Sequence, residues 1–592
     1  MRMKGLTHQS LWLDELHTMN EADPSLSWSE LFRYLKCCDP HPPLYFITER
    51  VAFSLFGHTE FVARSISALA GTVSILAIYL LGKELANKNL GYIAAILVCV
   101  NPYNLFYSQE ARCYIFAFLF AILSYLFFVK LIKSPKGKNL IGYAIFILLL
   151  LYSHHYGLFV LVSQASIGLL FMWQERGAER KRMIKFFALS AIIVIVGYIP
   201  MVPFILEVSR INSFWIVTTD TAFLQTYFNE YFGGSAILKT VLIGLLLVFV
   251  VRVTQENYKE PGKLRSNPLL SAFLILLSWV FITVLIPYIR SLLVIPMLYP
   301  RYTIVILPAI LLAVAYGIEL INNNLVKWIV LSLVVILSLV NIIAEKKYYS
   351  SVSKTQFREM TAFITSENKA NYPIINQLTC WHQQYYLKRS GSKAMTVTGD
   401  KEVIIDSILS GKAKFGQSGF WVAGAHGDKM ISDEKAKAID TSYILLMQKD
   451  FYDAWARLYI ARDQTAKNII ILTENDFIDG ALLPADKIVA IWNGAIRSRP
   501  VSLQKAEYSL SILARGDKGG GVYPHLNIYI NDRKLADFFV SDKMENRSFS
   551  FDNPVAGDAV IKIEMDNDFF QPGLGDRNAF ISRIIFELNT SK

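Results

Sequence analysis

Residues 112–132 read RCYIFAFLFAILSYLFFVKLI, an apolar run in which Arg112 and Lys130 are the only charged side chains. As a helix, such a run is long enough to cross the hydrocarbon core of a bilayer, which is about 30 Å thick. Nine more apolar runs of comparable character lie on either side of it, at 61–82, 91–106, 139–153, 156–173, 185–206, 236–252, 268–288, 302–320 and 326–345. Together with a mean hydropathy of +0.35 over 592 residues, these runs predict a polytopic α-helical membrane protein with about ten spans.

Basic residues are concentrated in every second connection between the predicted spans: Lys83, Lys88, Lys133, Lys136, Lys138, Arg176, Arg180, Lys181, Arg182, Lys185, Arg252, Lys259, Lys263, Arg265 and Lys327. Because positively charged loops stay on the cytoplasmic side, this alternation orients all spans. An even number of spans then places both the amino-terminal segment and everything after residue 345 outside the cytoplasm. We expect an integral protein of a bacterial plasma membrane. The net charge of +11 forms no continuous basic face with interleaved aromatics, so we expect no nucleic-acid partner.

The segment 1–60 precedes the first predicted span and carries the adjacent carboxylates Asp14 and Glu15. The proline-interrupted apolar stretch 40–57 predicts an interfacial helix that lies along the membrane. An exported loop normally follows a first transmembrane helix or a signal peptide, and neither precedes Asp14. We therefore expect that translation starts further upstream or that the chain is a truncated form.

Residues 61–345 form the predicted membrane domain. The composition changes after its last span. Residues 346–484 alternate helix-like stretches with short apolar runs at 403–405, 420–422 and 444–446, which predicts a small α/β domain. Residues 485–592 contain alternating strands at 526–530, 548–551 and 560–563, separated by Gly, Asn and Asp turns. This second pattern predicts a β-sandwich.

A series of short motifs in the first 345 residues resembles the GT-C glycosyltransferases of the protein O-mannosyltransferase and lipid A aminoarabinose transferase type. No single motif is decisive, but their order and their positions at the outer face match that family. They are Leu11-Trp12-Leu13-Asp14-Glu15, His41-Pro42-Pro43-Leu44-Tyr45, the stretch from Phe56-Gly57 through Glu60 to Arg64, Tyr107-Ser108-Gln109-Glu110-Ala111-Arg112-x-Tyr114, His154-x-Tyr156-Gly157 and Arg301-Tyr302.

The resemblance implies an inverting transfer of a monosaccharide from a polyprenyl-phosphate donor to a glycan, lipid or protein acceptor outside the cytoplasm. It makes Asp14 the general base that removes the acceptor proton, and Glu15 the residue that orients Asp14 or the acceptor. The leaving lipid phosphate needs cationic or hydroxyl partners. The family positions that match as substrate-binding residues are His41, Tyr107, Glu110, Arg112, His154, Tyr156, Arg301 and Tyr302. The aminoarabinose enzymes carry a lysine where this chain has His41, which is only partly charged at neutral pH.

Simpler explanations exist for several of these residues. Glu110 and Arg112 would neutralise each other at a helix start, and Arg301 would serve as an interfacial anchor. His154 and His155 would be packing residues or, alternatively, metal ligands. A divalent metal at the carboxylates stays open, because no residues there have dedicated ligand spacing.

The last hundred residues resemble small calcium-dependent xylan-binding carbohydrate modules. The matching features are Gly519-Gly520-Gly521-Val522-Tyr523-Pro524, Asn567-Asp568 and Gly575-Asp576-Arg577-Asn578. The resemblance implies a Ca²⁺ ion held by Asp568, Asp576 and the carbonyl of Tyr523, with hard oxygen ligands that suit this ion. The alternative is that Asp568 and Asp576 are ordinary turn residues.

Two other functions compete with the transferase. A non-catalytic membrane protein for glycan binding, sensing or export would use the same sandwich, but transport predicts ionisable residues within several spans. In this chain the ionisable residues gather at the outer ends of the spans. A ligase that moves a whole lipid-linked oligosaccharide is the nearer rival.

Overall fold

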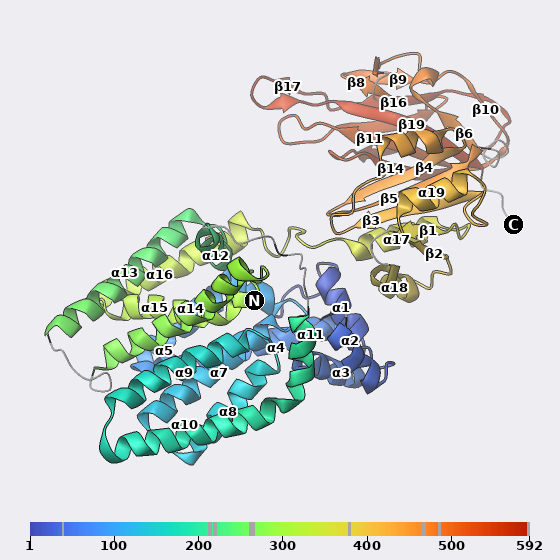
Figure 1. Ribbon diagram of the computed structural model, residues 1–592. Coiled ribbons are helices and arrows are strands. Elements are labelled where there is room, and N and C mark those ends of the chain that lie inside the picture. Colours follow the sequence, from blue (N-terminus) through green and yellow to red (C-terminus); the bar gives the residue numbers. More distant parts are fainter. Residues whose placement is uncertain are drawn as a thin grey trace. The chain divides into compact units, whose positions relative to one another are not determined.

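The fold is described from a computed structural model (Figure 1), which covers residues 1–37, 39, 41–210, 216, 222–259, 267–376, 380–462, 469–483 and 487–588. The chain forms two compact units. The first comprises Met1–Gln9 and Asp14–Val352, and the second comprises Ser10–Leu13 and Ser353–Lys592.

Three short helices open the first unit: α1 (Leu13–Glu21), α2 (Trp28–Cys37) and α3 (Leu44–Phe56). Helix α3 occupies the stretch predicted as an interfacial helix. It begins directly after Pro42 and Pro43, with Pro43 at the N-cap, and it ends at Gly57, whose φ of 95° is unfavourable for other residues.

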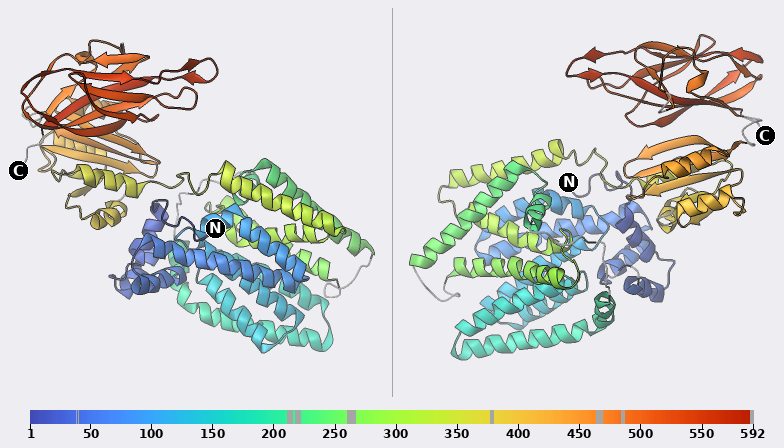
Figure 2. Two further views of the ribbon diagram at one scale, coloured as in Figure 1. Left: turned by 180° about the vertical axis from the view of Figure 1, so that it is seen from behind. Right: turned by 45° about the horizontal axis from the view of Figure 1, so that its top comes forward.

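The remaining helices of this unit form one bundle (Figures 1 and 2). They are α4 (Glu60–Leu85), α5 (Lys88–Val100), α6 (Pro102–Ser108), α7 (Tyr114–Lys133), α8 (Gly137–Leu151), α9 (Gly157–Gln174), α10 (Gly177–Tyr198), α11 (Val202–Ser209), α12 (Phe223–Tyr231), α13 (Ala236–Lys259), α14 (Pro268–Leu293), α15 (Leu307–Glu319) and α16 (Asn324–Val340). The 3-10 turns η1 (Ile199–Met201) and η3 (Tyr302–Ile306) lead into α11 and α15, and the turn η4 (Asn341–Glu345) follows α16.

Within the described residues, eight helices are long and apolar enough to cross a membrane, fewer than the ten spans predicted. The predicted span 91–106 is bent by 64° between α5 and α6, because Pro102 starts a new helix that Asn101 caps. The predicted span 139–153 corresponds to α8, whose 15 residues extend about 22 Å, short of the bilayer core.

Small residues let the membrane helices approach one another closely. A Cβ atom added to Gly82 of α4 would lie 2.9 Å from Cα of Gly91 in α5, and one added to Gly317 of α15 would lie 2.1 Å from the carbonyl oxygen of Leu245 in α13. Such contacts are typical of helix pairs in membranes, where packing rather than water exclusion holds helices together.

The second unit begins with a mixed five-stranded sheet of order β2-β1-β3-β5-β4. Its strands are β1 (Ile374–Asn376), β2 (Thr396–Thr398), β3 (Gly419–Ala425), β4 (Tyr443–Phe451) and β5 (Ala454–Ala461), and its helices are α17 (Phe357–Glu367), α18 (Cys380–Arg389), α19 (Lys401–Leu409) and α20 (Asp433–Asp440). The apolar runs 420–422 and 444–446 lie in β3 and β4, whereas the run 403–405 lies in α19.

Two antiparallel sheets follow, and their inner faces enclose a common apolar core (Figure 2). One has the order β14-β11-β19-β8-β7, with β6 also paired to β19, and the other has the order β13-β12-β16-β9. The strands are β6 (Ile469–Leu472), β7 (Ala481–Leu483), β8 (Ile488–Ile491), β9 (Gly494–Arg497), β11 (Ala506–Gly516), β12 (His525–Ile530), β13 (Arg533–Phe539), β14 (Glu545–Asn553), β16 (Ile561–Met565) and β19 (Ala579–Leu588). Two short strand pairs complete this part of the unit: β10 (Val501–Leu503) with β15 (Gly557–Ala559), and β17 (Phe570–Gln571) with β18 (Gly575–Asp576).

Candidate active site

The sequence-predicted residues of the first unit converge at one end of the helix bundle. This end is formed by α1 and by the connections before α3, α7, α9 and η3, which carry Asp14, His41, Arg112, His154 and Arg301. Hydrogen bonds and ion pairs link these segments directly, although they lie far apart in the sequence. The basic connections after α4, α7, α9 and α15 follow the opposite ends of their helices.

Asp14 forms an ion pair with Arg301, in which Oδ2 lies 3.0 Å from Nη1. The two side chains are 17% and 11% exposed, so the pair lies at the edge of the site rather than in its core. The guanidinium of Arg301 also faces the rings of Tyr299, Tyr302 and Tyr114 at 5.1, 5.6 and 5.8 Å. An anionic ligand that competes for the Arg301 guanidinium would release the Asp14 carboxylate from this pair.

Glu15 faces the other way and is fully buried. Its carboxylate accepts two hydrogen bonds from Arg64 of α4, at 2.7 Å from Nε and 2.6 Å from Nη2, and a third at 2.9 Å from the backbone N–H of Ala111. Nη1 of Arg64 donates to the carbonyl oxygens of Leu6 and Gln9 at 2.6 and 2.8 Å. The pair therefore ties α1 to α4 and to the connection before α7. The Glu15 carboxylate is thus held inside the bundle by Arg64 and Ala111, whereas Asp14 lies at the edge of the site.

Arg112 pairs with Asp39, a carboxylate that the sequence did not single out. Nη1 of Arg112 lies 2.6 Å from Oδ2 and Nη2 lies 3.3 Å from Oδ1, while Nδ1 of His41 bonds to Oδ1 of the same carboxylate. Although burial opposes ionisation, Arg112 and then His41 hold the pKa of Asp39 well below its usual range. Asp39 thus fixes the Arg112 and His41 side chains in one place.

Glu21 and His17 lie one helical turn apart on α1 and close to Asp39. The distance from Nδ1 of His17 to Oε1 of Glu21 is 3.6 Å. Burial, and after it the charge of Asp39, raises the pKa of Glu21 well above its usual range, and burial lowers the pKa of His17. A signal for this pair existed in the sequence, because a histidine and a glutamate four residues apart share one face of a helix.

His154 lies in the connection before α9 among aromatic rings. Its ring centroid is 5.5 Å from Tyr302, 5.6 Å from Tyr156 and 5.8 Å from Tyr114. Nδ1 of His154 accepts a hydrogen bond of 3.1 Å from the backbone N–H of Tyr156. Burial and then the charge of His41 lower its pKa well below the usual value, so the ring is neutral and carries its proton on Nε2. His154 therefore presents a hydrogen-bond donor.

The remaining predicted residues shape the same region. The hydroxyl of Tyr156 donates to the carbonyl oxygen of Met297 at 2.6 Å, which ties the connection before α9 to that before η3. Tyr107 is buried, with its ring 5.2 Å from that of Tyr114. Glu110 is buried too, and its carbonyl accepts from the backbone N–H of Arg112 at 2.8 Å. The interpretation that Glu110 merely neutralises Arg112 is not needed, since Arg112 has its ion pair with Asp39.

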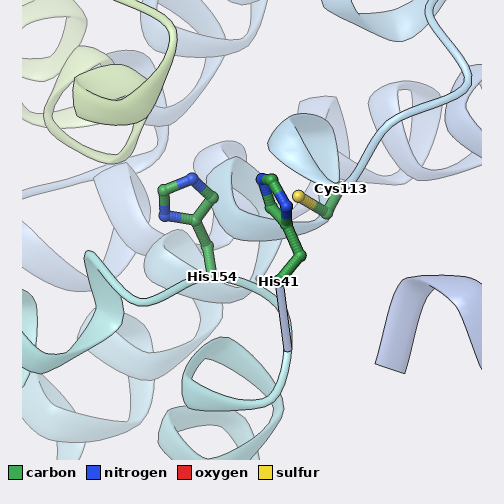
Figure 3. Close-up of side chains that lie close together, drawn as sticks. All are labelled: His41, Cys113 and His154. Atoms are coloured by element: carbon green, nitrogen blue, oxygen red, sulfur yellow. The ribbon is translucent and has the colours of Figure 1, made fainter. Parts of the chain in front are cut away.

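His41, Cys113 and His154 point toward one another (Figure 3), with potential ligand atoms within 4.8 Å. Burial raises the pKa of the Cys113 thiol to about 12. A His/Cys/His set is a familiar metal-binding combination, but the hydrogen bond at Nδ1 of His154 uses the lone pair of its unprotonated nitrogen.

An apolar groove of about 220 Å³ opens beside the site. Its lining is formed by α12, α14 and the start of α15, from Phe223, Leu224, Tyr227, Phe228, Tyr231, Val280, Phe281, Val284, Leu285, Tyr288, Ile306 and Ile310. At the end nearest the site, the hydroxyl of Tyr231 bonds to Oγ1 of Thr303 at 2.7 Å, two residues from Arg301. No sequence signal marked this groove, since its residues are ordinary for membrane helices.

In the second unit, the residues expected to hold Ca²⁺ lie on adjacent loops of the sandwich. Asp568 and Asp576 are exposed, and Asp576 pairs with Phe570 in the β17–β18 hairpin. The carbonyl oxygen of Tyr523 accepts a hydrogen bond of 3.0 Å from Nδ2 of Asn567, which leaves it one lone pair. Oδ1 of Asn578 is buried and has no hydrogen-bond partner among the described residues. These hard oxygen atoms fit a Ca²⁺ ion.

Arg577 holds together the two loops that carry the expected Ca²⁺ ligands, and the sequence did not predict this role. Nε of Arg577 donates to the carbonyl oxygen of Val522 at 3.0 Å and Nη2 donates to that of Gly519 at 2.5 Å. Its Nη1 donates to the carbonyl oxygen of Asn567. The loop that carries Tyr523 is thereby fixed against the loop that carries Asp568.

Two protein-family models match this chain, one in each unit. Residues 40–203 match the family model described as dolichyl-phosphate-mannose-protein mannosyltransferase, and residues 509–589 match the model described as Ca-dependent carbohydrate-binding module, xylan-binding. A curated relative, dolichyl-phosphooligosaccharide-protein glycotransferase 1 of Pyrococcus horikoshii, is 28% identical over 175 residues. That match covers 27% of this chain and spans only 18% of the relative's length.

Two solved structures of ArnT from Cupriavidus metallidurans resemble the model, and each comparison covers 77% of this chain and 95% of that one. The apo structure has a TM-score of 0.51 at 11% identity, and the structure bound to undecaprenyl phosphate has a TM-score of 0.48 at 10% identity. Residues 40–203 are thus similar to the mannosyltransferase model, the fold is similar to that of ArnT, and residues 509–589 are similar to the calcium-dependent xylan-binding modules.

Proposed function

We propose that this protein transfers a monosaccharide from a polyprenyl-phosphate donor to an acceptor outside the cytoplasm, with inversion at the anomeric carbon. The observation that carries the proposal is the Asp14–Arg301 pair, 3.0 Å apart and partly exposed at the end of the bundle. It places a general base and a phosphate-binding cation in one site, and the reaction needs one group of each kind. The donor must separate the two so that they lie on opposite sides of the anomeric carbon.

In this proposal the donor phosphate competes with Asp14 for Arg301. Once Arg301 binds the phosphate, the Asp14 carboxylate is released to accept the proton of the attacking hydroxyl or amine. The acceptor oxygen or nitrogen forms a bond to the anomeric carbon while the bond to the phosphate oxygen breaks. A single displacement of this kind inverts the configuration. The products are the glycosylated acceptor, polyprenyl phosphate and a proton on Asp14.

The leaving phosphate gains negative charge, and three donors face the place where it forms. Arg301 and Arg112 provide fixed positive charge, and Nε2–H of neutral His154 provides a hydrogen bond. Arg112 is held in position by Asp39, so little reorganisation accompanies the reaction. His41 shares the Asp39 carboxylate and completes this side of the site.

The polyprenyl chain of the donor would lie in the apolar groove between α12, α14 and α15. The groove is lined by apolar and aromatic side chains and ends at Tyr231, whose partner Thr303 is two residues from Arg301. A chain that occupies the groove therefore brings its phosphate toward the cation. Burial of isoprenoid carbon there contributes roughly 25 cal/mol per Å² of apolar surface.

The carboxy-terminal module supports a glycan acceptor. Asp568, Asp576 and the carbonyl of Tyr523 would hold a Ca²⁺ ion that coordinates sugar hydroxyls, with Oδ1 of Asn578 as a further oxygen nearby. A module of this kind would keep a cell-envelope polysaccharide close to the membrane. The alternation of basic connections supports an extracytoplasmic position for α1 and for the second unit.

The test is a transfer assay with a panel of radiolabelled polyprenyl-phosphate monosaccharides and membranes that contain the protein. We expect release of polyprenyl phosphate from one donor class, with a product whose anomeric configuration, read by NMR, is opposite to that of the donor. Retention of configuration would overturn the single displacement. If no donor is consumed, the protein is instead a non-catalytic membrane protein for glycan binding, sensing or export. Consumption of lipid-linked oligosaccharides alone would identify a ligase.

A further inference from the structure

We propose that the second unit positions the candidate base Asp14, with Tyr386 as the positioning residue. The chain changes units just before this base, because Ser10–Leu13 belong to the second unit and Asp14 belongs to the first. Residues of the second unit therefore hold the segment that leads into Asp14. The catalytic consequence rests on the proposed transferase function, whereas the hold on the segment does not.

Tyr386 of α18 makes the central contact with this segment. Its hydroxyl oxygen accepts a hydrogen bond of 2.9 Å from the backbone N–H of Leu11 and lies 3.4 Å from Oγ of Ser10. All three residues are buried, so water competes little for these bonds. Loss of the Tyr386 oxygen would leave a buried backbone N–H without its acceptor, which is costly in free energy.

Ser10 also completes the start of α17. The first N–H groups of a helix lack partners within it, and a serine oxygen is a preferred acceptor for them. Gln356, which directly precedes α17, uses its side-chain oxygen for the N–H of Tyr452 at 2.8 Å. Oγ of Ser10 accepts the N–H of Arg358 at 3.0 Å. A serine 348 residues away in the sequence thus takes the role of a local cap.

The segment lies at the edge of the sheet where open α/β folds bind their ligands. Strands β1, β3 and β4 run in one direction, because β1 pairs with β3 in parallel and both β3 and β4 pair with β5 in antiparallel. At their carboxyl ends, His426 follows β3 and contacts Trp12, with ring centroids 6.1 Å apart. Ligands of open α/β sheets bind outside the carboxyl ends of the strands. Residues 10–12 therefore occupy the place of a ligand.

Asp453, in the turn between β4 and β5, makes this edge rigid. Its Oδ1 accepts the N–H of Gly427 at 2.8 Å, and its Oδ2 accepts the hydroxyl of Thr355 at 2.5 Å. Its carbonyl oxygen accepts the N–H of His426 at 2.9 Å. The turn after β3 and the start of α17, which both contact residues 10–12, are thereby fixed to each other.

The hold on Leu11 restricts Asp14 through the covalent chain. Asp14 follows Leu11 by three residues, and three residues span at most about 11 Å when fully extended. A displacement of a catalytic group by about 1 Å can lower a rate by about 100-fold. Tyr386 is a positioning residue in this account, because it acts on Asp14 only through Leu11.

The first measurement follows backbone amide exchange by mass spectrometry in the full-length protein in detergent. Tyr386→Phe keeps the ring and removes the oxygen that accepts from Leu11. We expect the Leu11 amide to exchange about five- to tenfold faster, as for the loss of one hydrogen bond. Tyr459→Phe, in β5 of the same sheet, is the matched control and should leave this amide unchanged. Ser10→Ala should speed exchange of the Arg358 amide to a similar extent.

The second measurement is transfer with the donor that wild type consumes. Tyr386→Phe should lower kcat about tenfold and leave KM for the donor unchanged, because Arg301 and the apolar groove belong to the first unit. In an Asp14→Asn background, Tyr386→Phe should have no further effect, since no base remains to be positioned. A merely structural defect would lower both rates by the same factor.

Three results would overturn the inference. These are exchange of the Leu11 amide at the wild-type rate in Tyr386→Phe, transfer by Tyr386→Phe at the wild-type rate, and an equal loss of transfer with and without Asp14→Asn. If Tyr386→Phe fails to fold, Ser10→Ala takes its place in the same comparison. If wild type consumes no donor, the proposed function fails, but the exchange rates still decide whether Tyr386 holds the segment.

Discussion

Replacing the carboxylate by an amide should destabilise the protein far more at Glu15 than at its neighbour Asp14. Glu15→Gln removes the negative charge from a fully buried ion pair and leaves the charge of Arg64 uncompensated. It also places an amide N–H₂ group against Nη2 or Nε of Arg64, which in the wild type donate to the carboxylate oxygens at 2.6 and 2.7 Å. Breaking one partner of a buried ion pair costs about 3–5 kcal/mol. Asp14→Asn affects a pair that is 17% and 11% exposed, where the loss should be about 1 kcal/mol or less.

The assay is equilibrium unfolding of the purified protein in mixed micelles, followed by tryptophan fluorescence, with Asp14→Asn as the matched control for the loss of one negative charge. Replacing both partners of the buried pair tests the reason for the effect. Glu15→Gln combined with Arg64→Met should be less destabilised than the sum of the two single changes, because no buried charge is left alone. A free energy of unfolding for Glu15→Gln within 1 kcal/mol of that of Asp14→Asn would refute the reasoning.

Three further predictions concern the site and the module. Arg301→Gln should lower kcat/KM for the lipid donor by about 10- to 100-fold, as expected for a lost charge-assisted hydrogen bond, and an unchanged kcat/KM would contradict the phosphate role. Val284→Trp should fill the apolar groove and raise KM for donors with a full-length polyprenyl chain, but not for short-chain analogues; equal effects on both would remove the chain from the groove. Asp568→Asn with Asp576→Asn should abolish Ca²⁺-dependent binding of xylan in calorimetry, and binding that persists without calcium would identify these residues as turn residues.

The sequence predicted the membrane fold because each helix carries its own signal. Apolar length and basic connections are local properties, so most spans were placed correctly. The two exceptions, the predicted spans 91–106 and 139–153, have local causes that the sequence itself shows. Asn101-Pro102 ends α5 and starts α6, as a capping residue followed by proline does, and α8 has only 15 apolar helical residues.

The site was predictable only where motifs recur in a known family. Asp14, Arg112, His154 and Arg301 lie in such motifs, and the structure brings them to one end of the bundle. Asp39 could not be found, since a single acid in a connection has no spacing pattern and its importance comes from Arg112, 73 residues away. Its contact depends on how α7 packs against the amino-terminal helices, and such tertiary information is absent from local sequence.

The buried role of Glu15 was also invisible. Sequence alone cannot tell which of two adjacent acids on a helix faces solvent, because neighbouring positions differ by about 100° around the axis. Only the position of Arg64 in α4 decides that Glu15 turns inward and Asp14 outward.

The central claim is that Asp14 accepts the acceptor proton. Its most direct test compares transfer rates of wild type, Asp14→Asn and Asp23→Asn in membranes that contain equal amounts of protein, with the donor that wild type consumes. Asp23 lies in the same amino-terminal segment but outside the site, so it controls for the loss of a negative charge there. Asp14→Asn should lose a factor of about 10²–10⁴ in rate, whereas Asp23→Asn should transfer as wild type does. Transfer by Asp14→Asn at the wild-type rate would contradict the account.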